Sequence, residues 1–296
     1  MITLSKTTDQ SAQIQWMAGR ICALVFSPNG QYLASAHGGA GVRVWFIGDS
    51  VLTGSLPVLK RNLPAPVVGA VAWSPDGTRI AAAHRDGKWI RIWTNASNKD
   101  PDEFVPPHDP QTRGTLPAAI AFVVFSPNGR LLAYGGERGH CHILNVGRAW
   151  CRLQTDLRGH NSYGTVSNAQ FDAHSRLIVT CSDDKCGSAC VWDARTGKLL
   201  MTVTRDGDDP VLVRDASFSP DGKLLLVAGK DGWLCLCGRL SVRLDDYGWR
   251  GVLTLDREIH SARFSPDGRS VWVLFLDGTV FVRELLDSNT EFKLFE

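Results

Sequence analysis

The chain has 296 residues, of which 44% are hydrophobic, and its 32 basic and 30 acidic residues give a formal net charge of +2. This near-neutral balance, without a dense run of Lys and Arg, argues against nucleic acid as the main partner. No stretch of about 18 apolar residues predicts a membrane span, and residues 1–6 lack the apolar core and cleavage site of a signal peptide. The expected compartment is therefore the cytosol or the nucleus.

One short motif recurs along the chain: an aromatic residue, then Ser-Pro, then Asn or Asp, then Gly. Complete copies begin at Phe26, Trp73, Phe125, Phe218 and Phe264, and a degenerate copy begins at Phe171. The spacing of roughly 47 residues is typical of repeat architectures in which each repeat packs against its neighbours.

Each copy predicts the same set of short strands. An apolar-rich strand precedes the aromatic residue, as at residues 21–25, and the Pro and Asn/Asp-Gly of the motif favour a tight hairpin turn. Second strands follow at residues 32–35, 80–83, 131–134, 177–180, 224–227 and 271–274. Third strands alternate, as at residues 42–45 and 90–93, and a weaker fourth strand follows, as at residues 198–203. Four short antiparallel strands per copy predict an all-β fold built of β-propeller blades.

The fourth copy has the most complete set of motifs, with Gly159-His160 before the first strand and Trp192-Asp193 in the third. These residues resemble the WD40 repeat family, and the resemblance spans residues 13–285. It implies a buried hydrogen-bond chain of Trp192, Thr180, His160 and Asp184. Such a chain makes physical sense because a buried indole N–H, hydroxyl and imidazole each require a partner.

The other copies depart from this pattern. None has Gly-His before its first strand, and the Trp position of the third strand is occupied by Leu144, Cys237 and Arg283 in the third, fifth and sixth copies. A TolB-type propeller repeats the same tetrapeptide and is the alternative fold assignment.

Six copies account for nearly the whole length, so we expect a single domain over residues 1–296 with six blades, seven being the alternative. Family members usually close the ring with an N-terminal strand. Residues 13–17 are the candidate for this strand, and the tail at residues 291–295 is its competitor. Residues 96–117 contain five prolines and predict an insertion loop between blades two and three, with one outer strand near residues 103–105.

The chain shows little sign of catalytic or metal chemistry. Cys181, Cys186 and Cys190 are near one another in sequence, but the short knuckle of a zinc site is absent. Residues 37–41 resemble an esterase oxyanion loop, but there is no Gly-x-Ser-x-Gly nucleophile elbow and no phosphate-binding loop. The sequence therefore predicts no metal, no cofactor and no enzymatic activity.

The family resemblance implies a binding surface where loops gather at one end of the propeller. Three positions per blade are expected to face it. The first position lies six residues before the aromatic residue of each copy and is occupied by Arg20, Val67, Ala119, Thr165, Leu212 and Glu258. The second lies four residues before it and is occupied by Cys22, Gly69, Ala121, Ser167, Arg214 and His260. The third directly precedes the acidic residue of the turn after the second strand and is occupied by Arg85, Glu137, Asp183, Lys230 and Leu276.

The guanidinium of Arg binds carboxylates through a planar fork. Arg20, Arg85, Arg214 and Lys230 are therefore predicted to meet an acidic or phosphorylated protein segment, with Asp183, Glu258 and His260 on the same surface. The alternative is that the basic side chains form ordinary ion pairs with Glu258, Glu137 and Asp183.

Two functions of different classes follow. The first is a non-catalytic scaffold that binds a protein or peptide on this surface, within a larger multi-protein complex. The second is an enzyme with a small-molecule site at the channel mouth, for which His37, His84 and Asp86 are the only weak candidates.

Overall fold

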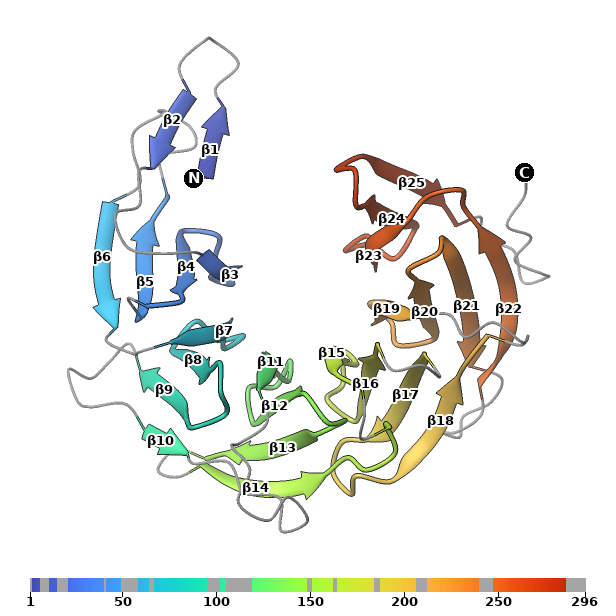
Figure 1. Cartoon of the computed structure of the whole chain (residues 1–296), viewed down its shortest axis with the longest axis horizontal. Helices are drawn as coiled ribbons and strands as arrows, with labels where there is room; N and C mark the ends of the chain where they lie inside the picture. Colours follow the sequence, from blue (N-terminus) through green and yellow to red (C-terminus); the bar gives the residue numbers. More distant parts are fainter. Residues whose placement is uncertain are drawn as a thin grey trace. The chain divides into compact units, whose positions relative to one another are not determined.

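The computed structural model describes residues 2–5, 11–14, 21–39, 41–48, 58–63, 67–94, 102–104, 119–147, 151–161, 164–183, 187–205, 212–239 and 247–285. These residues form strands and turns, and no helix among them is long and apolar enough to cross a membrane (Figure 1). The chain comprises two compact units: Met1–Phe125 with Val146–Arg152, and Ser126–Asn145 with Leu153–Glu296. The expectation of a single domain therefore stays a prediction.

The first unit contains a hairpin and two four-stranded antiparallel sheets, here called blades 1 and 2. The hairpin pairs β1 (Ile2–Ser5) with β2 (Ser11–Ile14). Blade 1 consists of β3 (Ile21–Phe26), β4 (Tyr32–His37), β5 (Gly41–Phe46) and β6 (Val58–Leu63), and blade 2 of β7 (Val68–Trp73), β8 (Arg79–His84), β9 (Ile90–Thr94) and β10 (Asp102–Phe104). The strand β11 (Ile120–Phe125) also belongs to this unit.

Blade 3 consists of β11 with β12 (Leu131–Gly136), β13 (Cys141–Val146) and β14 (Cys151–Asp156). The second unit holds three further sheets. Blade 4 is β15 (Val166–Phe171), β16 (Leu177–Ser182), β17 (Ser188–Asp193) and β18 (Leu199–Val203); blade 5 is β19 (Val213–Phe218), β20 (Leu224–Gly229), β21 (Trp233–Arg239) and β22 (Tyr247–Thr254); blade 6 is β23 (Ile259–Phe264), β24 (Ser270–Phe275) and β25 (Val280–Glu284). Consecutive strands pair within each sheet, as predicted for propeller blades.

The repeated tetrapeptide forms the turn between the first and second strands. In blade 5, the Ser219 hydroxyl donates to Asp221 Oδ1 and accepts from the Leu224 N–H, at 2.6 and 2.9 Å. Gly222 supplies the positive φ that the turn requires, at 69°. In the degenerate copy, Asp172 replaces this serine, and its Oδ1 accepts from the Leu177 N–H at 2.8 Å. The motif is therefore a local device that ends one strand and starts the next.

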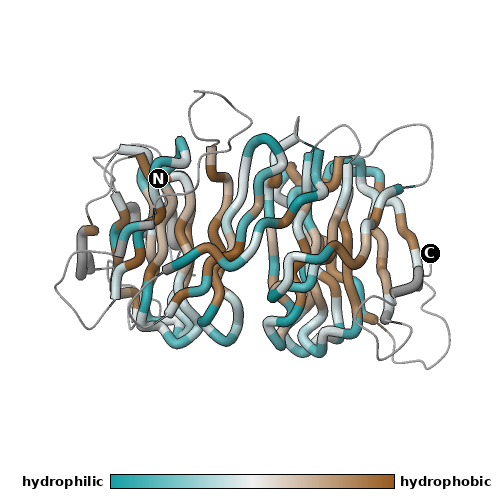
Figure 2. The backbone as a smooth tube through the Cα atoms, turned by 90° about the horizontal axis from the view of Figure 1, so that it is seen from below, coloured by the Kyte–Doolittle hydropathy of each residue, from teal (hydrophilic) through white to brown (hydrophobic). Residues whose placement is uncertain are grey.

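Apolar side chains between neighbouring blades form the cores. One cluster joins blades 4 and 5 through Val179, Val191, Val227 and Cys235, all fully buried. Similar clusters join blades 1 and 2 and blades 5 and 6. Figure 2 shows the same distribution, with hydrophobic residues along the strands and hydrophilic residues at many of the turns. Within each of these pairs, the facing surfaces of the two sheets are buried against each other, as stacked repeats require.

Several expectations about the outer strands can now be placed. The strand expected near residues 103–105 is β10, which pairs with β9; most of the 96–117 loop lies outside the described residues. Gln13 and Ile14 lie in β2, where they pair with Thr3 and Ile2. Residues 15–17 and 291–295 lie outside the described residues. In the described part of blade 6, β25 is the last strand.

Candidate protein-binding surface

Five innermost strands carry a β-bulge at the same place. The pairing with the second strand skips one residue in β3, β7, β15, β19 and β23; the skipped residues are Cys22, Gly69, Ser167, Arg214 and His260. These are the residues four before each aromatic, which the family resemblance placed on the binding surface. A bulge leaves its extra residue outside the ladder and re-aims the side chain. The backbone therefore provides, in each of these five blades, one position that takes no part in strand pairing and is occupied by a different residue type from blade to blade.

A backbone hydrogen bond brings the two other predicted positions together beside four of the five bulges. The N–H of Lys230 donates to the carbonyl of Leu212 at 2.8 Å, and the N–H of Leu276 donates to that of Glu258 at 3.0 Å. The same bond joins Asp183 to Thr165 in blade 4 and Arg85 to Val67 in blade 2. Each of these blades thus presents a triplet, here defined as the bulge residue and the two hydrogen-bonded residues beside it.

The triplets of blades 5 and 6 combine apolar and charged side chains. Leu212 and Leu276 are 37% and 46% exposed, which is unusual for leucine. Between the blades, Lys230 Nζ lies 3.8 Å from Glu258 Oε2. The two blades therefore offer exposed leucines on either side of a solvent-exposed ion pair.

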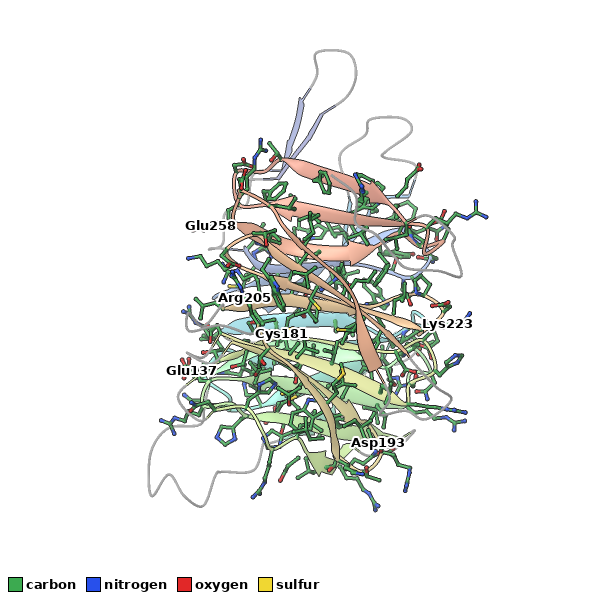
Figure 3. All side chains as sticks on the ribbon, turned by 90° about the vertical axis from the view of Figure 1, so that its right-hand side faces the viewer. Glu137, Cys181, Asp193, Arg205, Lys223 and Glu258 are labelled. Atoms are coloured by element: carbon green, nitrogen blue, oxygen red, sulfur yellow. The ribbon has the colours of Figure 1, made fainter. Side chains whose placement is uncertain are left out.

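Two further ion pairs lie in the same turns. Arg205 pairs with Asp231 at 2.5 Å, and Arg257 lies 3.8 Å from Asp277. The Thr279 hydroxyl and N–H, together with Arg257, hold the pKa of Asp277 below its ordinary value. Figure 3 shows Arg205 and Glu258 at one end of the strands and Lys223 at the other. Much of the charge at the triplet end of blades 5 and 6 is therefore neutralised within the molecule.

The predicted basic residues differ in their surroundings. Lys230 lies 3.8 Å from Glu258 and both side chains are exposed, so the predicted contact of Lys230 with a partner stays a prediction. Arg85 is exposed and Arg214 is half-buried, and neither forms an ion pair with another described residue. Arg85 belongs to the first unit and Arg214 to the second. Arg20 lies outside the described residues.

The remaining predicted residues of this surface are also placed. Asp183 is exposed, and its Oδ1 accepts from the Thr165 N–H at 2.8 Å, so this carboxylate orders the loop before β15. His260 is exposed at the bulge of blade 6. Glu137 forms an isolated backbone bridge with Thr165.

A buried polar chain supports the triplet of blade 4. Trp192 Nε1 donates to Thr180 Oγ1 at 2.7 Å, and the same hydroxyl oxygen lies 2.6 Å from His160 Nε2. Thr180 and Trp192 are fully buried. A Cβ on Gly159 would approach the Trp192 ring to 2.8 Å, so glycine is needed before this histidine. The fourth expected member, Asp184, lies outside the described residues.

Blade 1 contains a second polar chain that the sequence comparison among the copies missed. Trp45 Nε1 donates to Ser35 Oγ at 3.0 Å, and Ser35 Oγ lies 2.9 Å from His37 Nε2. Here the histidine comes from the second strand itself rather than from the loop before the first strand. The available signal was the Ser-x-His spacing, since residues two apart in a strand share a face.

The cysteines and histidines that the sequence offered as candidates for metal binding or catalysis lie within or beside strands of the blades. Cys181 and Cys190 are buried on neighbouring strands of blade 4, while Cys186 lies outside the described residues. Within the described ranges, no group of three or more His, Cys, Asp or Glu could hold a metal ion. His84 Nδ1 accepts from the Asp86 N–H at 3.0 Å, and burial lowers the pKa of this histidine.

Comparisons with known proteins agree with this architecture. The family model described as "WD domain, G-beta repeat" matches residues 13–45, 58–94, 150–193 and 197–237, which is just over half of the chain. The beta-propeller domain of Cps50 (Swd1) from Myceliophteria thermophila superposes with a TM-score of 0.67 at 15% identity, covering 91% of this chain and 83% of that one.

Curated relatives share less of their length. The chain is 28% identical to a guanine nucleotide-binding protein subunit beta-1 of Nicotiana tabacum, over 77% of this chain and 57% of that protein. It is 27% identical to an LST8 homolog of Drosophila melanogaster, over 58% of this chain and 51% of that protein. The chain thus spans little more than half the length of these relatives. With the matched repeats and the propeller fold, the chain belongs to the WD40 repeat family.

Proposed function

We propose that the chain is a non-catalytic scaffold that binds a protein or peptide segment at the triplet end of its blades. The observation that carries this proposal is the triplet itself: a bulge and a backbone hydrogen bond hold three variable side chains together on successive blades. Rigid strands that present variable loop residues are a common basis for binding. The first curated relative is named as a subunit, which supports a role within a protein complex.

The contact is expected to centre on blades 5 and 6. Leu212 and Leu276 supply apolar area that a partner can bury, and Arg214 supplies a guanidinium that forms no ion pair with another described residue. An acidic or phosphorylated residue of the partner would pair with Arg214. Arg85, in the first unit, is a separate candidate for the same kind of contact. The Lys230–Glu258 pair is expected to act as a polar rim, because exposed ion pairs contribute little energy.

Capture from native extract tests this proposal. Immobilised wild-type chain is compared with Leu212→Asp/Leu276→Asp, with Arg214→Glu, and with Lys223→Glu as the matched control at the opposite end of blade 5. Bound proteins are identified by mass spectrometry, and circular dichroism checks folding. A partner retained by wild type and by the control, but lost by both surface variants, supports the proposal.

Two other outcomes would redirect the assignment. Retention of the same partner by all variants would contradict a contact at this end. Loss of the partner on phosphatase treatment of the extract distinguishes a phosphorylated partner segment from one that is merely acidic.

The enzyme alternative gains no support from His37 and His84, since the first belongs to a buried polar chain and the second accepts a turn N–H.

A further inference from the structure

An apolar pocket lies between blades 5 and 6, within the second unit. Its inner wall includes Leu226, Leu236 and Val273, which are buried. Its outer wall includes Leu253 of β22 and Phe281 of β25, which are half-buried. Because the outer wall is partly exposed, a group from outside the molecule can reach the buried side chains behind it.

The strand registers show which position of blade 4 corresponds to this pocket. Val191 lies opposite Met201 in blade 4, and Leu236 lies opposite Gly251 in blade 5. In both blades the pairing of the third and fourth strands shifts directly after this pair. Met201 and Gly251 therefore occupy the same place beside a β-bulge.

Between blades 4 and 5, a methionine side chain covers the equivalent place. Met201 packs against the buried cluster that joins these two blades. Cys235, which corresponds in register to Phe281 of blade 6, is fully buried in that cluster. Gly251 has no side chain that could cover the junction of blades 5 and 6 in the same way, so the outer wall stays half-buried there.

The size and the lining of the pocket limit what can enter it. Its volume is about 20 Å³, somewhat more than one water-sized probe occupies and far below the roughly 150 Å³ that holds benzene. Eight of the nine described residues that line it are apolar, and the ninth is Arg283. Since an apolar cavity gives a water molecule no hydrogen-bond partner, the fitting occupant is the end of a single aliphatic or thioether side chain.

We propose that this pocket receives one methionine or leucine side chain from a partner protein, in the place that Met201 occupies between blades 4 and 5. Methionine fits best, because its unbranched, polarizable side chain fills irregular gaps. One anchor side chain in a fitted pocket can supply a large share of the binding energy of an interface. The pocket shares no residue with the triplets, so this contact is a second site beyond the proposed function.

Methyl NMR of the whole chain tests the proposal, with carbon-13 labels on the leucine and valine methyl groups. The probe is ethyl methyl sulfide, which is the side chain of methionine as a free molecule. It should shift the methyl signals of Leu236, Leu253 and Val273 with a Kd of about 1 mM, a value within reach of a ligand of this size. Gly251→Met should abolish these shifts, because its side chain fills the pocket from β22. Val252→Met, at an exposed position of the same strand, should leave them unchanged.

A pair of peptides distinguishes a protein side chain from a free small molecule. The acetylated and amidated peptide Gly-Ser-Met-Ser-Gly should produce the same shifts as the sulfide. The same peptide with Ser in place of Met should produce none. Shifts from the sulfide without shifts from the Met peptide would overturn the proposal, because a protein segment could then not reach the pocket.

Other results would also overturn it. Absence of any shift in the wild type would mean that the pocket is closed or already filled within the chain. Should circular dichroism show that Gly251→Met does not fold, Gly251→Leu replaces it, and unchanged shifts in that variant would place the probe elsewhere. The surface variant Leu212→Asp/Leu276→Asp should bind the probe as the wild type does, so that a failure of the pocket and a failure of the triplet surface are read separately.

Discussion

The two tryptophans Trp45 and Trp192 occupy equivalent places on the third strands of blades 1 and 4, and both donate to a hydroxyl on the second strand. In blade 4 the hydroxyl of Thr180 also contacts His160, which comes from the loop before the first strand. In blade 1 the histidine is His37, from the second strand itself. In both blades a histidine contacts the hydroxyl that accepts from the tryptophan, but the two histidines come from different parts of the repeat.

Thr180→Val tests the polar chain of blade 4. Valine keeps the shape but leaves the buried indole N–H of Trp192 and the imidazole of His160 without their partner. We expect a loss of about 1–3 kcal/mol in the free energy of unfolding, the usual cost of an unsatisfied buried polar group. Urea denaturation measures it. Thr202→Val, on the exposed side of β18, is the control, and an equal effect of both substitutions would contradict the argument.

At the residue scale the sequence predicted positions better than interactions. His160, Thr180 and Trp192 lie where the family resemblance implied, because a complete motif fixes their places. The hydrogen-bond chain of Trp45, Ser35 and His37 was missed because the copies were compared by their motifs, and not by which residues share a face of a strand. The sequence placed Lys230 and Glu258 on one surface and left an ion pair between them as an alternative, because their distance depends on how blades 5 and 6 pack, which no local pattern gives.

The turns show how an element is built from a few local hydrogen bonds. In the Asp-containing copies, the carboxylate of Asp76 or Asp221 accepts from a serine hydroxyl and from the N–H two residues on. Burial alone would raise the pKa of Asp76 and Asp221, but these hydrogen bonds outweigh it and the pKa lies below its ordinary value. At Asp267, the Ser265 hydroxyl is the main cause of the lowered pKa.

These turns predict part of the acid sensitivity of the fold. A carboxyl whose pKa is lower in the folded state contributes stability above its unfolded pKa of about 4 and loses it as the pH falls through the folded value. Replacing Asp76, Asp221 and Asp267 by Asn should therefore flatten the decrease of the free energy of unfolding below about pH 4. Asn128 makes the same serine contact in blade 3, so the turn should persist.

Urea unfolding at a series of pH values gives the measurement for the triple variant. The single variant Asp183→Asn, outside these turns, serves as the comparison. An unchanged slope below pH 4 in the triple variant would show that the acid sensitivity arises elsewhere.

The innermost strands of the second unit are protected by side chains from neighbouring blades. Asp215 Oδ2 accepts from the Ala262 N–H at 3.0 Å, and Gln170 Oε1 accepts from the Phe218 N–H at 2.7 Å. Burial raises the pKa of Asp215, and the neighbouring Arg263 opposes this effect. Side chains of one blade thus accept hydrogen bonds from backbone N–H groups of the next blade that are not paired within their own sheet.

Asp215→Ala should therefore be costly. The substitution removes the ion pair with Arg263 and leaves the Ala262 N–H without its acceptor. Because Arg263 is 40% exposed, the main cost is the unsatisfied buried N–H, about 1–3 kcal/mol, readable as a shift in the urea midpoint. Glu258→Ala, which breaks an exposed ion pair, should cost less than about 1 kcal/mol. Equal costs would contradict the assigned role of Asp215.

At the scale of the whole molecule, the repeat period predicted the fold class because each copy carries its own turn and strand signals. The same period could not predict the division into two compact units, which depends on packing between sheets. Nor could it predict the exposure of Phe26, at 63%, when the equivalent Trp73 and Phe218 are buried. That difference depends on what lies next to each blade rather than on the copy itself.

Charge at the scale of the molecule also bears on partner binding. The net charge is +2, and three ion pairs occupy the turns of blades 5 and 6. A partner captured through Leu212 and Leu276 should therefore lose less than about tenfold in affinity between 0.05 and 0.5 M NaCl. Titration by fluorescence anisotropy measures this, and a loss of a hundredfold or more would indicate a contact dominated by charge.

The bulges of the innermost strands have a consequence for how this protein can diversify. Because Ser167, Arg214 and His260 stand outside the ladder, side chains of many kinds can replace them without shifting strand register. Recognition and folding are thereby encoded at separate positions. A combinatorial library confined to these three sites should retain the thermal stability of the parent while its members acquire different specificities, one blade at a time.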